Sequence, residues 1–158
     1  NIKKERKDNE RSRYECRLMD QIIKMSQIEY PSIMVDMEVE GLINQYKEEI
    51  RSNSQNEEEY KEKIKQLSEV KLKEDLHPMA ERRVLWSIII NEVANIENIN
   101  ISDKEIDDEI EFMISDVGDS KEEQRDFLND YQNRLNIYEI VKARKTLKQL
   151  TDIVKANK

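Results

Sequence analysis

Apolar residues recur along most of this chain at the 3.6-residue period of an α-helix, and short polar or extended stretches separate the periodic segments. The pattern predicts a first helix over residues 2–26 and an extended link at 28–30. A second helix is expected over 31–52, with Pro31 in its first turn, where a missing N–H costs nothing. The polar run at 52–56 predicts a loop.

The middle of the chain changes from polar to strongly apolar. Residues 57–75 predict a polar helix, and Pro78 should kink or restart the helix that follows. Between 84 and 94 almost no polar face is left, which is typical of a helix buried on several sides. We therefore place the centre of the protein there. The predicted core residues are Val84, Trp86, Ile89, Ile90 and Val93.

The last third begins with a second extended link at 99–101, followed by a capping box from Ser102 to Glu105. Gly118 is expected to end the helix that this box opens. The buried stripe predicted for that helix is Ile106, Ile110, Met113, Ile114 and Val117. A second capping box, from Ser120 to Glu123, predicts another helix, and a final helix is expected over about 134–156.

The two links resemble each other at an offset of 71 residues, and each one opens a helix with similarly spaced apolar positions. We interpret this echo as two helical arms. The predicted fold class is all-α, an elongated multi-helix domain with two arms. Within residues 1–158 we expect a linker helix at 1–27, a first arm at 28–98, a second arm at 99–134 and a closing helix at 135–158.

Composition supports a helical fold and argues against several enzyme scaffolds. Only four residues are Gly or Pro, where average usage would give roughly 19. Hairpin-rich barrels and phosphate-binding loops need more of both. The net charge is −8, and residues 97–130 hold 13 acidic and 3 basic side chains, which sum to −10. Such a balance disfavours nucleic-acid binding, which requires a basic face. No apolar run approaches the length of a membrane span.

Candidate catalytic and metal-binding residues are scarce. His77 is the single histidine and Cys16 the single cysteine, so an activated nucleophile lacks a ready partner. We read His77 as an ordinary surface residue. The acidic residues around 103–111 lack the spacing of a calcium loop, and we interpret them as a solvated helix face. We expect no catalytic residue, no metal and no cofactor.

Binding is better supported, because some apolar residues fall off the main stripes. Met34 and Met37 lie beside Ile33 on a second arc of the helix at 31–52, and Phe112 points away from the stripe of its own helix. Methionine is a flexible apolar residue that adapts to varied partners, and an exposed apolar patch usually marks an interaction site. The candidate contact residues are Ile33, Met34, Met37, Tyr46 and Phe112.

Three segments, in this order, resemble the C-terminal domain of the bacterial trigger factor family. They are IEYPSIMVDMEV at 28–39, LHPMAERRV with IIINEV at 76–93, and NINISDKEI at 98–106. The resemblance implies an ATP-independent chaperone domain that binds nascent or unfolded polypeptide in the bacterial cytoplasm, within a protein active in folding and export. It also implies that ribosome docking and prolyl isomerase activity belong to domains missing from this chain.

Two other interpretations stay open at this stage. The same apolar patches are compatible with a helical adaptor or dimerisation module, including a weak homodimer, or with a periplasmic chaperone of the SurA type. We expect no membrane partner and no enzyme activity for this chain. Binding to the ribosome would occur only through the missing N-terminal domain.

Overall fold

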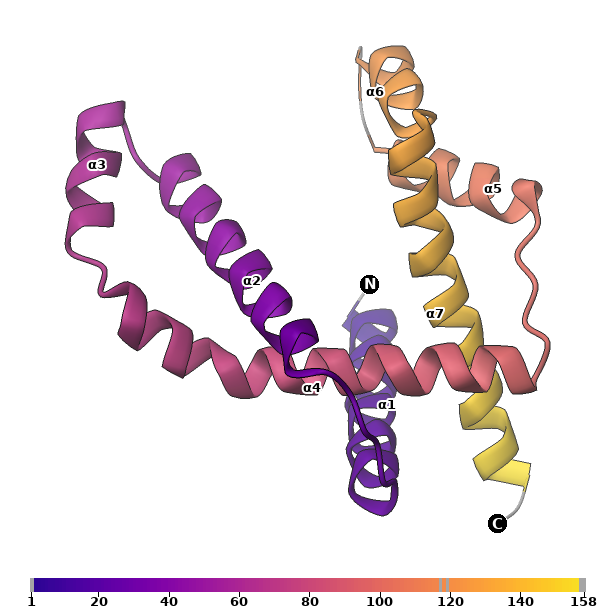
Figure 1. The fold of residues 1–158 in the computed structure, drawn as a ribbon. Helices are drawn as coiled ribbons and strands as arrows, with labels where there is room; N and C mark the ends of the chain where they lie inside the picture. Colours follow the sequence, from indigo (N-terminus) through magenta and orange to yellow (C-terminus); the bar gives the residue numbers. More distant parts are fainter. Residues whose placement is uncertain (1, 117, 119, 157–158) are drawn as a thin grey trace. The chain divides into compact units, whose positions relative to one another are not determined.

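The computed structural model describes residues 2–116, 118 and 120–156, and these residues form helices and connecting segments without a strand (Figure 1). The predicted all-helical class is therefore confirmed. The helices are α1 (Ile2–Met25), α2 (Ser32–Ser52), α3 (Glu57–Lys65), α4 (Glu69–Ile96), α5 (Asp103–Met113), α6 (Lys121–Leu128) and α7 (Tyr131–Ala156).

The chain divides into two compact units. Unit 1 combines residues 1–18 with 89–158, and unit 2 consists of residues 19–88. Unit 1 therefore contains the start of α1, the end of α4 and all of α5 to α7. Unit 2 contains the end of α1, all of α2 and α3, and most of α4.

Unit 2 is held together by one apolar face of α2, which packs against α4. The buried residues of this cluster are Val35, Val39, Leu42, Ile43, Ala80 and Val84. Leu72 and Leu76 continue the α4 side of the cluster at four-residue intervals, which places them on the same helix face as Ala80. Helix α3 lies beside the end of α2 before the chain turns into α4 (Figure 1).

In unit 1, α5 packs against α7, and α6 leads into the start of α7 (Figure 1). Ile106 and Ile110 of α5 and Ile137 of α7 are buried together. Ile101, Leu128, Tyr138 and Val141 surround them as half-buried residues. This small cluster is the apolar contact that fixes α5 on α7.

Helix ends are formed with little help from glycine. Asn98 adopts a left-handed conformation with φ of 51°, and the Ile99 N–H donates to the Ala94 carbonyl at 2.8 Å. This is a Schellman ending for α4, with Asn in the position where Gly is usual. The predicted capping box at the start of α5 is confirmed, because Ser102 and Glu105 bond to each other's backbone N–H groups. Pro31 is the N-cap of α2 and not its first helical residue, so the helix begins one residue later than predicted.

Two predictions for the middle of the chain concern breaks in helices, and the first of them is wrong. The polar helix expected over 57–75 is interrupted at 66–68, where the Ser68 hydroxyl accepts from the Lys71 N–H at 3.4 Å and starts α4. Helix α4 contains Pro78, so the helix does not restart there. The face carrying Leu76 and Ala80 is packed against α2, and this packing outweighs the hydrogen bond that Pro78 removes.

Further corrections concern helix ends and stripes. Helix α5 ends at Met113, five residues before Gly118, and Met113 is exposed. Ser120 precedes α6 but makes no side-chain cap bond, because its ψ of 16° departs from the extended conformation that aims the hydroxyl at the helix. Val117 lies outside the described residues.

The predicted core segment at 84–94 is only partly buried. Val84 and Ile89 are buried, whereas Trp86, Ile90 and Val93 are half-buried. The Arg82 guanidinium covers one face of the Trp86 ring at 5.3 Å. Among the described residues, no helix combines the length and apolar content needed to cross a membrane.

Candidate functional site

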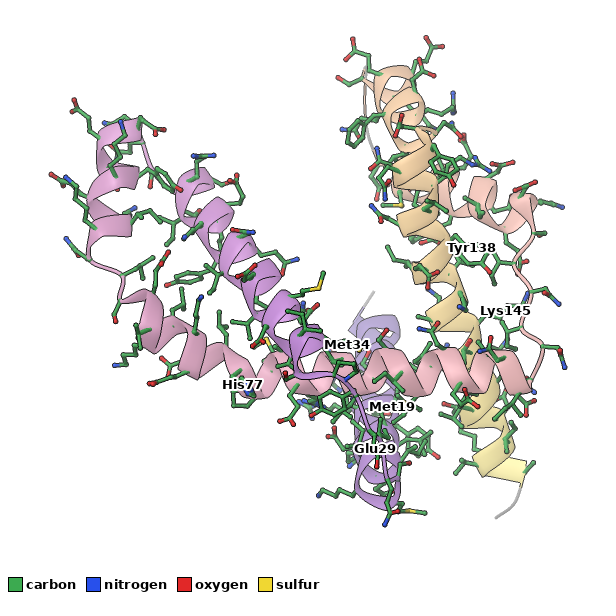
Figure 2. The ribbon with its side chains drawn as sticks, viewed as in Figure 1. Met19, Glu29, Met34, His77, Tyr138 and Lys145 are labelled. Carbon is green, nitrogen blue, oxygen red and sulfur yellow. The ribbon has the colours of Figure 1, made fainter. Side chains whose placement is uncertain are left out.

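Three neighbouring apolar side chains of α2 are exposed, and we call Ile33, Met34 and Met37 the α2 patch. Their exposed fractions are 58%, 38% and 67%. Spacings of three and four residues bring Ile33 and Met34 onto the same side of the helix as Met37. Figure 2 shows Met34 near the start of α2. The patch is thus a continuous apolar surface on the first turns of this helix.

The apolar core of unit 2 is built without the α2 patch. The opposite side of α2 already supplies Val35, Val39, Leu42 and Ile43 to the core. Helix α2 therefore has two apolar faces, of which α4 covers one. Exposed apolar side chains gathered in this way are typical of a surface that binds a partner.

A cleft of about 370 Å³ lies next to the patch, between α2 and α4. Its lining residues are Ile33, Asp36, Val39, Glu40, Lys73 and His77. Ile33 belongs to both the patch and this α2–α4 cleft, so the two features form one surface. His77 is exposed, as predicted, and Figure 2 shows it on α4. The cleft thus offers an apolar floor with charged groups of both signs.

Polar contacts fix the position of α2 beside this cleft. The Tyr30 hydroxyl, just before α2, donates to the Glu81 carboxylate, and this hydrogen bond raises the pKa of Tyr30. Near the end of α2, the Lys47 ammonium donates to Glu69 at 2.8 Å. The same bond raises the pKa of Lys47 and lowers that of Glu69. Both ends of α2 are therefore tied to α4.

Phe112 is exposed on α5, with an exposed fraction of 72%. It borders a second cleft of about 370 Å³ between α5 and α7, where Val141 supplies the other apolar side chain. The remaining lining residues are Glu105, Asp108, Glu109 and Arg144. Phe112 belongs to unit 1, whereas the α2 patch belongs to unit 2.

Most acidic residues of α5 are exposed, as expected for a solvated helix face, and several of them also pair with basic residues. Four carboxylates at every second position form what we call the α5 ion-pair row. The pairs are Glu105–Lys145 at 2.7 Å, Asp107–Arg134 at 2.7 Å, Glu109–Arg144 at 2.7 Å and Glu111–Arg125 at 2.7 Å. Asp103 lies 3.9 Å from Arg134, and Asp108 is exposed.

The ion-pair row lowers the pKa of its carboxyl groups. The Lys145 ammonium and the Ser102 hydroxyl and N–H bring the pKa of Glu105 to about 2. Hydrogen bonds from Arg144 lower the pKa of Glu109, and those from Arg125 lower the pKa of Glu111. Figure 2 shows Tyr138 and Lys145 on the α7 face that meets α5 and its preceding link. These carboxylates therefore lie next to basic side chains of α6 and α7.

The described residues contain no group of three or more His, Cys, Asp or Glu side chains arranged to hold a metal ion. The five predicted contact residues are all exposed. Tyr46 also belongs to α2, but its spacing places it on the side that carries the core residues. Within unit 2, the structure thus brings Ile33, Met34 and Met37 together and leaves Tyr46 on another side of α2.

Comparison with known proteins places the chain in a family. The family described as bacterial trigger factor protein (TF) C-terminus matches residues 1–152. The chain belongs to this trigger factor C-terminal family. Two trigger factors of Dehalococcoides mccartyi, from strains CBDB1 and ATCC BAA-2266, are 32% and 33% identical to it over 97% of its length. A trigger factor of Carboxydothermus hydrogenoformans is 31% identical over 63% of it.

The chain spans 34% of the length of both Dehalococcoides proteins and 23% of the length of the Carboxydothermus protein. No solved structure matches the chain. Membership of the trigger factor C-terminal family agrees with the helical fold. It also agrees with the three sequence segments that resemble this family.

Sequence reasoning missed several residues of these surfaces. Asp36, Glu40 and Lys73 line the α2–α4 cleft, but their helix positions give no sign of it, since α2 and α4 are distant in sequence. The predicted apolar stripes also do not single out Phe127 and Tyr131, which are both exposed. Their position in an acidic stretch of the sequence was the available signal.

Proposed function

We propose that this chain binds unfolded or nascent polypeptide through the α2 patch, as the chaperone part of a trigger-factor-like protein. The binding is weak and reversible and requires neither ATP nor a cofactor. Tyr46 and Phe112 provide further client contacts. Ribosome docking and prolyl isomerase activity belong to other domains of such a protein, which acts in the bacterial cytoplasm in folding and export.

The observation that carries the proposal is the second apolar face of α2. Ile33, Met34 and Met37 stay exposed although α2 already has a buried face against α4. Methionine side chains are unbranched and adapt to partners of different shape. Such a surface suits many unrelated apolar segments better than one folded partner. Membership of the trigger factor C-terminal family supports the same function.

The test compares two variants of the chain in an assay that follows aggregation of a chemically denatured client protein. In I33S/M34S/M37S the α2 patch is removed. In the control variant V70S/M79S, two exposed apolar side chains of α4 in the same unit are removed. Burying an apolar side chain contributes about 1.5–3 kcal/mol, so the first variant should lose at least about tenfold in client affinity.

We expect wild type and V70S/M79S to suppress aggregation of the client. I33S/M34S/M37S should lose this suppression. Circular dichroism should give the same helicity for all three proteins, because every substituted side chain is exposed. Equal suppression by all three would show that the α2 patch is not the client site. Saturable binding of one folded protein, with no binding of unfolded client, would favour the adaptor function instead.

A further inference from the structure

Two of the three side chains of the α2 patch are thioethers that solvent can reach. Met34 is 38% exposed and Met37 is 67% exposed, and the two residues lie three positions apart on one face of α2. A thioether sulfur is oxidised by peroxides, whereas the aliphatic side chain of Ile33 is not. The α2 patch therefore contains two reactive groups within an apolar surface.

The packing beneath the patch is inert toward the same oxidants. The buried cluster that joins α2 to α4 consists of Val, Leu, Ile and Ala side chains. Met19 of α1, labelled in Figure 2, is 0% exposed, so its sulfur is shielded from solvent. An oxidant therefore reaches Met34 and Met37 without acting on the side chains that hold unit 2 together.

Oxidation makes a methionine side chain polar. Methionine sulfoxide carries a polar S–O bond whose oxygen accepts hydrogen bonds from water. Contact with an apolar segment of a client removes that water and leaves the oxygen without a partner, which is unfavourable. Two sulfoxides on neighbouring turns of α2 therefore convert the apolar patch into a polar surface.

We propose that Met34 and Met37 form an oxidation switch, in which their conversion to sulfoxides releases unfolded client from the α2 patch and their reduction restores binding. This switch rests on the proposed binding of unfolded polypeptide by the same patch. In the oxidation step, a lone pair of the sulfur attacks one oxygen of a hydroperoxide such as hydrogen peroxide. The O–O bond breaks, an S–O bond forms, and the departing hydroxide takes the remaining proton and becomes water. Sulfur loses the two electrons that the peroxide gains. In the reverse step, a methionine sulfoxide reductase uses a dithiol, which becomes a disulfide while the oxygen leaves as water.

The test uses the whole chain with Cys16→Ser in every protein, because Cys16 is exposed and reacts with the same oxidant. Each protein is treated with hydrogen peroxide and freed of it before client is added. Fluorescence anisotropy with a labelled, permanently unfolded client measures the affinity before and after treatment, and peptide mass spectrometry locates the added oxygen. We expect sulfoxide at positions 34 and 37 and none at Met19, with at least about a tenfold loss of client affinity.

Two variants identify the methionines that are responsible, and each is compared with itself before treatment. M34L/M37L has apolar side chains of similar volume that peroxide does not oxidise, so treatment should change its affinity by less than about twofold. The matched control M25L/M79L/M113L removes three exposed methionines outside the patch and should lose affinity on treatment as the parent does. Methionine sulfoxide reductase with dithiothreitol should restore the affinity of the treated parent.

Equal losses in treated M34L/M37L and in the treated parent would overturn the inference, as would a parent that carries both sulfoxides and keeps its affinity. Mass spectra without oxygen at 34 and 37, under conditions that oxidise Met25, would overturn it too. Circular dichroism should give the same helicity before and after treatment, and a loss of helicity would assign the effect to unfolding instead of a switch. Each of these results leaves the proposed function intact as long as untreated protein binds unfolded client, whereas no binding by untreated protein would refute both.

Discussion

The packing of α5 on α7 provides a sharp prediction, because two kinds of interaction hold it and their magnitudes differ. Ile110 is 2% exposed and packs with Ile106 and Ile137. Truncation of a buried Ile to Ala costs about 2–5 kcal/mol, since apolar contacts are lost and a cavity is left. We therefore expect Ile110→Ala to release α5 from α7 much more often than in wild type.

The ion pairs should matter far less, despite their number and short distances. Glu111 and Arg125 are 2.7 Å apart, but their side chains are 51% and 38% exposed. An exposed pair contributes about 0.2–1 kcal/mol, because water screens the charges and two long side chains must be ordered. Glu111→Gln should therefore have a small effect beside that of Ile110→Ala.

Amide hydrogen exchange in a peptide covering residues 103–113 measures the opening of α5 directly. A loss of 2 kcal/mol lowers protection by about thirtyfold, and a loss of 1 kcal/mol by about fivefold. Ile110→Val is the matched control, with an expected cost of about 0.5–1.5 kcal/mol. If Glu111→Gln lowered protection of α5 as much as Ile110→Ala, the ion-pair row would be the main support and the argument from burial would be wrong.

Three further predictions concern stability. Gly41 lies within α2 with open space around its missing Cβ, so Gly41→Ala should raise the free energy of unfolding by about 0.5–1 kcal/mol in urea titrations; a lower value would mean that the site requires glycine. Pro78→Ala restores an N–H inside α4 and should stabilise by up to about 3 kcal/mol in the same titrations, whereas destabilisation would show that the ring is needed there. The lowered pKa of Glu105, about 2, means that its stabilising contribution is complete above the ordinary value of 4.5 and disappears as the pH falls toward 2. Urea titrations between these pH values should show that the free energy of unfolding falls less steeply with decreasing pH in Glu105→Gln than in wild type. An equally steep fall in both proteins would contradict the lowered pKa of Glu105.

Local signals in the sequence predict most of the helices. Periodic apolar residues and the Ser102–Glu105 capping box define α2 and α5, because these interactions lie within a few residues along the chain. The break before α4 depends on a single cap at Ser68 in a polar stretch, which a periodicity argument overlooks. Continuity through Pro78 depends on packing against α2, and the sequence around Pro78 contains no sign of that contact.

A residue of the candidate site can be predicted from the sequence where it is apolar but lies outside the apolar stripe of its helix. The spacing of apolar residues identifies Met34 and Met37 in this way, because it shows which helix face is not needed for the core. Partners distant in sequence cannot be recognised from spacing. Glu105 pairs with Lys145, 40 residues away, and Glu109 with Arg144, 35 residues away, so the acidic run alone does not show these pairs.

The central claim is that the α2 patch contacts unfolded polypeptide, and site-specific photo-crosslinking tests it most directly. A photoreactive phenylalanine derivative replaces Met37, and in a control protein it replaces Glu62, which is exposed on α3 of the same unit. The account predicts that a permanently unfolded client crosslinks at position 37, with little product at 62 and none when the client is folded. Equal crosslinking at both positions, or none at 37, would contradict it.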